Sequence, residues 1–286
     1  MKDFAMDVTK RFGGLTDSEW LERLKLSVKQ EYVDQMQFPG FPPAQLQAQF
    51  VGSSFEAALN EAGQFYGDTK TWFKEATGRH LDPSCRVLDF GVGWGRIIRF
   101  FWRDVGPENL YGVDVDPEIL QVCRATRVPG TLEPIQPGGR LPFPDGHFDL
   151  VFAYSVFTHL AEEAHLHWMT EIRRVLRPGG LFVGTLEPRR FIDFIARIPE
   201  DAPSSWHKSL KAHAGDAQVL KESFDQGEFV YIPTGGGKFR DASFYGDAVV
   251  PLAYVQSKWQ GFEIRKYVDD PARYWQAVLV AARAFV

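Results

Sequence analysis

A short segment of the chain combines an acidic residue with three glycines at alternate positions. It reads Val87-Leu88-Asp89-Phe90-Gly91-Val92-Gly93-Trp94-Gly95-Arg96. Glycine lets the backbone turn sharply and approach a ligand where a Cβ would intrude, and a helix that follows offers unpaired N–H groups at its start. Asp114 ends the next apolar run, 19 residues after Gly95. At that separation in the sequence a carboxylate can bind both hydroxyls of a ribose. The pattern predicts a site for a cofactor that contains a nucleoside.

Two classes of cofactor fit such a loop. A nicotinamide dinucleotide site prefers Gly-x-Gly-x-x-Gly with the pyrophosphate on the helix, whereas here Gly95 comes one residue early. Asp89 stands two residues before the first glycine, where a carboxylate would repel a pyrophosphate but attract a cationic amino-acid tail. S-adenosylmethionine has such a tail. The spacing therefore favours a methyltransferase over an NAD-dependent oxidoreductase, which remains the less favoured alternative.

Alternating strands and helices must position this loop. Asp116 followed by Pro117 predicts a helix start after the second strand. The alternation is typical of a parallel sheet with crossover helices. Strands are predicted over 86–90, 110–114, 131–135, 148–153, 181–186, 262–268 and 276–282, and helices over 97–103, 162–177 and 249–259.

Two further regions flank this α/β pattern. Residues 1–84 read as helical, with a helix that begins at Ser53, in a capping-box spacing with Glu56, and ends near Gly78. Residues 188–246 interrupt the alternation, and helices over 191–198 and 206–222 and a hairpin around 234–238 are predicted there. We therefore predict an N-terminal helical cap (1–84) and an α/β domain (85–286) that carries an insertion (188–246) after its fifth strand.

The chain resembles the class I S-adenosylmethionine-dependent methyltransferases, in particular bacterial members that act on small molecules. The resemblance is carried by VLDFGVGWGR (87–96), LYGVDVDP (110–117), LPFPDGHFDLVFAYSVFTHL (141–160) and EIRRVLRPGGLFVGTL (171–186). It implies a Rossmann-like sheet of seven strands, in which strand seven inserts antiparallel between strands five and six.

The resemblance also implies residue roles. Asp89 should hold the amino group of the cofactor, Asp114 its ribose hydroxyls, and Val115 should lie against the adenine. Many relatives have an acid after strand three that reaches the adenine amino group, but here Gln136 or a backbone carbonyl must serve. The cofactor-binding positions implied are Asp89, Gly91, Gly93, Gly95, Arg96, Asp114, Val115, Gln136, Tyr154, Ser155 and Val156, the last three beside the sulfonium.

Methyl transfer from a sulfonium is an in-line displacement whose leaving thioether needs no acid, so catalysis rests mainly on alignment. An oxygen acceptor also needs its proton removed. The candidate bases near the strand ends are His159, Tyr154 and Glu187. An imidazole ordinarily titrates near neutral pH, and we take His159 and Tyr154 as the candidate catalytic residues.

The sequence after the fourth strand narrows the acceptor. Tyr154-Ser155-Val156-Phe157 stands where methyltransferases of exocyclic base or glutamine nitrogens carry Asn/Asp-Pro-Pro-Tyr. Methylation of pyrimidine C5 would need a cysteine nucleophile in this segment, and the segment has none. We expect a small molecule or glycan as acceptor, methylated on oxygen or nitrogen. The aromatic insertion is predicted to form a lid and acceptor pocket, or else a contact between two copies of the chain. The chain could also bind the cofactor without catalysis, as a sensor or regulatory subunit.

Composition excludes several other classes of protein. With 32 basic and 37 acidic residues the net charge is −5, which argues against a nucleic-acid partner. Two cysteines cannot form a disulfide framework, and no Cys/His cluster has metal-ligand spacing. No apolar run approaches the ~20 residues of a membrane span, and the first 25 residues lack a signal peptide's apolar core. We expect a cytoplasmic protein without a metal.

Overall fold

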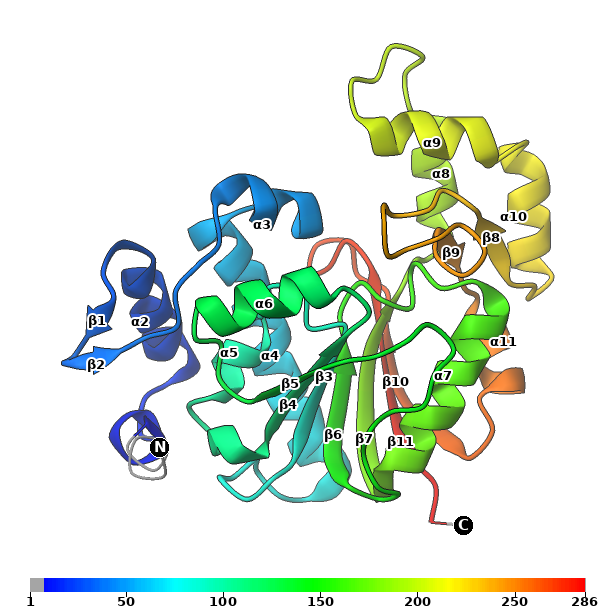
Figure 1. Ribbon diagram of the computed structural model, residues 1–286. Coiled ribbons are helices and arrows are strands. Elements are labelled where there is room, and N and C mark those ends of the chain that lie inside the picture. Colours follow the sequence, from blue (N-terminus) through cyan, green and yellow to red (C-terminus); the bar gives the residue numbers. More distant parts are fainter. Residues whose placement is uncertain (1–7, 286) are drawn as a thin grey trace. The chain divides into compact units, whose positions relative to one another are not determined.

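The computed structural model of the protein, which describes residues 8–285, contains a mixed sheet of seven strands (Figure 1). Their order is β10-β11-β7-β6-β3-β4-β5. β11 pairs antiparallel with both β7 and β10, so the predicted fold, including its inserted antiparallel last strand, is confirmed. The strands are β3 (Val87–Phe90), β4 (Leu110–Asp114), β5 (Thr131–Pro134), β6 (Phe148–Ala153), β7 (Leu176–Leu186), β10 (Phe262–Val268) and β11 (Ala277–Arg283).

Contacts between residues divide the described chain into two units. Unit 1 comprises 8–135 and His147–Phe152, and unit 2 comprises Gln136–Gly146 and 153–285. The glycine loop lies in unit 1, whereas the candidate bases lie in unit 2. Each unit is described by itself below.

Unit 1 is built on parallel strands. β3 pairs with β4 and β6, and β4 pairs with β5, all in parallel. Every side chain of β3 is buried, as expected for a parallel strand that is covered on both faces. The flanking helices are α5 (Ile98–Phe101), α6 (Pro117–Ala125) and, from the N-terminal segment, α4 (Phe55–Thr77). The predicted start of α6 is confirmed, because Asp116 accepts hydrogen bonds from the N–H groups of Glu118 and Ile119 at 2.9 and 3.2 Å.

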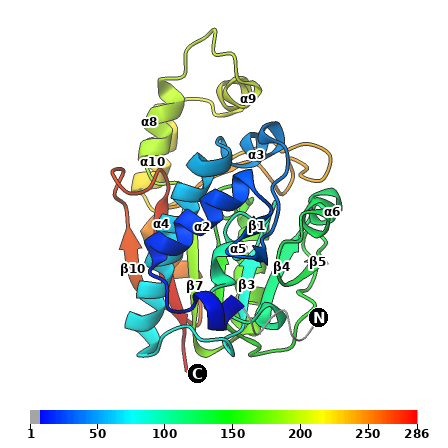
Figure 2. The same cartoon turned by 90° about the vertical axis from the view of Figure 1, so that its left-hand side faces the viewer.

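The N-terminal segment belongs to unit 1, where α2 packs against α4 (Figure 2). The predicted helix start at Ser53 is wrong: Ser54 is the N-cap and makes no side-chain cap bond. The Phe55 N–H, which would need such a cap, instead donates to Gln47 Oε1 at 2.8 Å. The predicted end at Gly78 is confirmed by its left-handed φ of 72°. The other elements here are α2 (Asp17–Lys29), β1 (Tyr32–Val33), β2 (Met36–Gln37) and α3 (Ala44–Val51).

Unit 2 holds the last helices and strands. α7 (Glu162–Val175) ends two residues earlier than predicted, and β7 begins directly at Leu176. Pro178 disfavours helical backbone at the residue before it, so the chain is already extended where the sequence pattern placed helix. α11 spans Leu252–Lys258, a shorter helix than the predicted 249–259.

The insertion is more broken than predicted. In place of one helix over 206–222, the chain forms α9 (Ser205–His213) and α10 (Ala217–Asp225). Gly215 between them has a φ of 70°, which ends a helix readily, and Asp216 caps α10 by accepting from the Gln218 N–H at 2.7 Å. Together with α8 (Arg190–Ala196) these helices gather around one apolar cluster (Figure 1).

A two-stranded ribbon completes the insertion. β8 (Val230–Ile232) pairs antiparallel with β9 (Asp247–Val249). The residues 234–238 therefore lie in a long loop over 233–246 and not in the tight hairpin turn that the triglycine predicted. Within residues 8–285, no helix is long and apolar enough to cross a membrane.

Candidate functional site

The glycine loop of unit 1 adopts a backbone that favours glycine at all three alternate positions. Gly91, Gly93 and Gly95 have φ values of 82°, 50° and 77°, which residues with a Cβ rarely adopt. A Cβ on Gly95 would also lie 2.5 Å from Cγ1 of Val128. The N–H groups of Gly91 and Val92 both donate to the carbonyl of Val113 at 2.9 Å. The loop is therefore tied to the end of β4, beside Asp114.

The two predicted cofactor acids meet at this loop. Asp89 is 3% exposed, and burial, together with the nearby negative charge of Asp114, raises its pKa well above the ordinary value. Asp114 accepts hydrogen bonds from the N–H groups of Gly93 and Asp116, both at 3.0 Å. A cation bound beside Asp89 would stabilise its carboxylate form. This pair of buried acids next to bare backbone thus fits a cofactor that carries an ammonium group and a ribose.

Other predicted cofactor residues of unit 1 have partners in the protein. Arg96 is buried and forms an ion pair with Glu61 of α4, so its guanidinium is already engaged. Val115 follows β4 directly and is half-buried. Two contacts not predicted from the sequence reach Gly93: a Cβ there would be 3.5 Å from the ring of Phe50, and Cys123 Sγ donates to its carbonyl at 3.0 Å.

The remaining predicted cofactor residues lie in unit 2. Gln136 is exposed, and its carbonyl accepts from the Gly139 N–H at 2.9 Å in a turn. Tyr154, Ser155 and Val156 follow β6 directly and are half-buried. The structure therefore brings Asp89, the glycines and Asp114 together within unit 1.

The candidate base His159 has a fixed orientation. Its Nδ1 lies 2.7 Å from the carbonyl oxygen of Gly246. A carbonyl can only accept, so Nδ1 carries the proton and Nε2 carries the lone pair. The ring stacks on Tyr245, with centroids 4.9 Å apart and an interplanar angle of 15°. This is the tautomer and orientation that a general base acting through Nε2 requires.

Asp247 stands behind the same imidazole. Its Oδ1 lies 3.6 Å from His159 Nδ1, and its side chain is almost fully buried. It accepts hydrogen bonds from Trp206 Nε1 at 3.2 Å and from Thr234 Oγ1 at 2.5 Å. We did not predict Asp247 from the sequence. The available signal was an acid that opens the apolar run Asp247-Ala248-Val249-Val250.

Glu187, the third candidate base, lies at the end of β7. It is 4% exposed, and burial raises its pKa to about 8. The hydrogen bond from Gln276 and the charge of Arg190 lower this pKa by smaller amounts, while the negative charge of Asp247 adds to the rise. Gln276 Nε2 donates to Glu187 Oε1 at 3.1 Å and to Ser155 Oγ at 3.0 Å. Gln276 begins the predicted last strand, and no sequence pattern marked it as functional.

Aromatic side chains of the insertion, together with Trp275 from outside it, form a ledge in unit 2. The rings of Phe191, Phe194 and Trp206 stack at centroid distances of 5.8 to 6.1 Å, and Trp275 meets Phe194 edge-on at 5.4 Å. Trp206 is 38% and Trp275 53% exposed. Phe229, another aromatic side chain of the insertion, packs against His165 and Tyr254.

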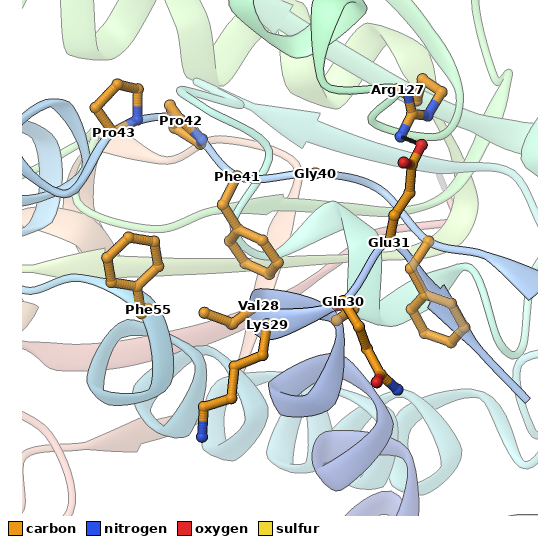
Figure 3. Close-up of a pocket in the computed structure, with 12 residues that line it drawn as sticks. Val28, Lys29, Gln30, Glu31, Gly40, Phe41, Pro42, Pro43, Phe55 and Arg127 are labelled. Carbon is orange, nitrogen blue, oxygen red and sulfur yellow. Dashed lines mark hydrogen bonds and ion pairs between the residues drawn. The ribbon is translucent and has the colours of Figure 1, made fainter.

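Unit 1 also contains a groove of about 570 Å³ (Figure 3). Phe41 and Phe55 lie at one end of it with ring centroids 6.4 Å apart, and the Glu31–Arg127 ion pair lies at the other. None of the predicted site residues lines it. No group of three or more His, Cys, Asp or Glu residues within 8–285 is placed to hold a metal ion.

Comparisons with known proteins agree on one activity class. A family model described as a methyltransferase domain matches residues 88–184. The chain is 35% identical over 190 residues to a fatty-acid O-methyltransferase of Mycolicibacterium smegmatis, covering 64% of this chain and 66% of that protein. It is 30% identical over 173 residues to a demethylmenaquinone methyltransferase of Symbiobacterium thermophilum, covering 55% and 67%.

The matched region spans only part of these relatives. For example, the chain is 35% identical over 107 residues to a 2-methyl-6-phytyl-1,4-hydroquinone methyltransferase of Synechocystis. That match covers 36% of this chain and 32% of the relative. Among solved structures, the PH0226 protein of Pyrococcus horikoshii is similar with a TM-score of 0.50 and 15% identity, over 77% of this chain and 89% of that one. At that identity the similarity concerns the fold alone.

Proposed function

Because the chain belongs to the class I S-adenosylmethionine-dependent methyltransferases, we propose that it methylates an oxygen, or else a nitrogen, of a small molecule or glycan. S-adenosylmethionine supplies the electrophilic methyl group. The protein's own tasks are then to align the acceptor with the methyl carbon and to remove the acceptor's proton.

Residues of unit 1 would hold the cofactor. In this proposal Asp89 binds the ammonium group, the backbone of Gly91, Gly93 and Gly95 surrounds the methionine part, and Asp114 binds the ribose hydroxyls. The support is the buried, like-charged acid pair, which a bound cation would stabilise. Arg96 stays a candidate cofactor residue whose guanidinium forms an ion pair with Glu61.

His159 would act as the general base. The observation that carries this proposal is the 2.7 Å contact between His159 Nδ1 and the Gly246 carbonyl, which leaves the lone pair on Nε2. The Asp247 carboxylate at 3.6 Å would stabilise the imidazolium that forms when Nε2 takes the acceptor's proton. Tyr154 would then contact the reactants without a role as base.

A histidine that is oriented to act as a base, as His159 is, favours an acceptor with a hydroxyl group. A carboxylate, such as that of the fatty acids on which the Mycolicibacterium smegmatis relative acts by its name, is already ionised at neutral pH and needs no base. A hydroxyl must lose its proton to become a good nucleophile. The ledge of Trp206 and Trp275 would pack against a ring or another apolar part of this acceptor, with the insertion as its lid.

The proposal is tested with purified protein and isotope-labelled methyl donor. Calorimetric titration should detect binding of S-adenosylmethionine and S-adenosylhomocysteine and none of NAD. Incubation with phenols, sugars, amines and fatty acids should then transfer the label to a hydroxyl compound. Binding of both adenosyl compounds without transfer to any member of a broad metabolite extract would favour the regulatory alternative. Binding of NAD alone would overturn the proposal.

A further inference from the structure

Ser155 is held in a conformation that serine rarely adopts. Its φ is 57°, in the left-handed region where a Cβ is unfavourable. Its backbone N–H donates to Thr185 Oγ1 at 2.7 Å, and Thr185 is fully buried on β7. Such strain persists only where the surroundings determine it, and it clusters at functional sites.

The hydroxyl of Ser155 is fixed as well. Its Oγ accepts a hydrogen bond from Gln276 Nε2 at 3.0 Å. The same Nε2 donates to Glu187 Oε1 at 3.1 Å, so both of its hydrogens are used. Since an Oγ lone pair is taken by Gln276, the Ser155 O–H is left to act as a donor.

The second polar neighbour of that hydroxyl is the candidate base. Ser155 Oγ lies 3.5 Å from His159 Nε2, longer than a strong direct hydrogen bond. An oxygen atom could sit at hydrogen-bond distance from both groups. It would meet a lone pair on Nε2, which takes a proton, and an O–H on Ser155, which donates one hydrogen bond.

Glu187 and Gln276 also leave hydrogen-bonding capacity unused. Glu187 Oε2 and Gln276 Oε1 are buried and have no hydrogen-bond partner among the residues that the structure describes. Unsatisfied buried polar atoms cost stability and call for an explanation. The explanation that we favour is that this network orients Ser155 for function and is not optimised for stability.

We propose that the Ser155 hydroxyl is a catalytic hydrogen-bond donor to the reacting oxygen of a hydroxyl acceptor, and that Gln276 and Glu187 are positioning residues that fix its direction. The inference rests on the proposed function and narrows its acceptor to alcohols and phenols. As the acceptor's proton passes to His159 Nε2, negative charge develops on its oxygen, and the Ser155 O–H stabilises it. A lone pair of the acceptor oxygen forms the new C–O bond to the methyl carbon. The bond between this methyl carbon and the sulfur of S-adenosylmethionine breaks, and its electron pair stays on the sulfur.

Ser155→Gly is the decisive variant. Glycine accepts a φ of 57° without strain, and this relief of backbone strain offsets the loss of the acceptor that Ser155 Oγ provides to Gln276 Nε2. We expect kcat for the hydroxyl acceptor to fall by about 10²-fold, with the melting temperature unchanged or higher and the affinity for S-adenosylmethionine unchanged. Ser84→Gly removes an exposed hydroxyl elsewhere and should leave kcat as it is.

A second pair of variants separates positioning from stability. Gln276→Leu should lower kcat while leaving the KM of the acceptor unchanged, but it also deprives buried Glu187 of its donor. The double variant Glu187→Leu/Gln276→Leu replaces both polar partners by apolar groups, which restores stability in such pairs. We expect the double variant to recover the melting temperature and not the kcat.

The outcomes distinguish this inference from the proposed function. If the wild-type protein transfers the methyl group to no small molecule, the proposed function fails and the inference fails with it. If the wild type methylates amines or carboxylates but no hydroxyl compound, the proposed function stands and the inference is wrong. If the wild type is active and Ser155→Gly keeps its kcat, the inference alone is wrong. If Ser155→Gly weakens binding of S-adenosylmethionine by the same factor as it lowers kcat, Ser155 is a cofactor contact, as the family resemblance implied, and the inference is again overturned.

Discussion

The carboxylate of Asp247 lies 3.6 Å from Nδ1 of His159, the ring nitrogen opposite the one that faces Ser155. Asp247 also accepts hydrogen bonds from Trp206 of α9 and from Thr234 in the loop before β9. One buried carboxylate therefore connects the insertion to the candidate base. The same residue that would stabilise the imidazolium also holds two parts of the insertion in place.

Asp247→Asn tests this connection. The amide keeps an oxygen that can accept from Trp206, but it is neutral and no longer stabilises a protonated His159. We expect kcat for a hydroxyl acceptor to fall by at least about tenfold, with binding of S-adenosylmethionine unchanged by calorimetry. Asp145→Asn, a change at a largely exposed acid in unit 2, is the matched control. An Asp247→Asn protein that keeps its full kcat would contradict the role assigned to Asp247.

The role of His159 predicts a difference between two kinds of acceptor. His159→Ala should lower kcat/KM for a hydroxyl acceptor by about 10²- to 10⁴-fold, the usual contribution of a general base. For any fatty acid that the wild type methylates, the loss should be less than about tenfold, because the carboxylate is already ionised. The measurement is label transfer to both acceptors in the same preparation. Equal losses for the two would show that His159 positions ligands and does not take a proton.

The glycine loop and the two acids beside it could be predicted from the sequence because their signals are local. The acid Asp89, the glycines and Asp114 lie within one strand–helix–strand segment, and each follows from a short-range requirement: positive φ at the glycines, and the end of β4 at Asp114. Asp116 was predicted as a cap from Pro117 beside it. These features need no knowledge of distant contacts.

The surroundings of His159, the candidate base, could not be predicted in this way. The Gly246 carbonyl that orients His159 is 87 residues from it in sequence, and Gln276 is 121 residues from Ser155. No local periodicity encodes such pairs, because they depend on how the chain returns after the insertion. Within the insertion, a single helix was predicted over 206–222, but the chain forms two helices there. Gly215 lies between them and Asp216 caps the second one.

The glycine loop provides a comparison within one segment. Gly93→Ala should cost about 1–2 kcal/mol, since an alanine Cβ is unfavourable at a φ of 50° and would meet only the Phe50 ring at 3.5 Å. Gly95→Ala should cost clearly more, because its Cβ would also lie 2.5 Å from Val128 Cγ1. Urea unfolding of both variants measures the difference. Equal unfolding free energies would show that the contact with Val128 relaxes without cost.

The burial of Glu187 predicts a pH dependence of stability. Its pKa is raised from 4.5 to about 8, so the folded protein holds this proton more tightly than the unfolded chain does. The unfolding free energy contributed by this group is therefore highest below about pH 4.5 and is lost progressively as the pH rises towards 8. The loss amounts to about 5 kcal/mol, at roughly 1.4 kcal/mol for each pKa unit. Glu187→Gln removes the titrating proton while keeping an oxygen that accepts from Gln276. Between pH 5 and 8, its unfolding free energy should fall less steeply than that of the wild type, with Asp89, whose pKa is also raised, contributing the same slope to both proteins. Denaturant titrations at several pH values measure both slopes, and parallel slopes would mean that Glu187 is not protonated in the folded state.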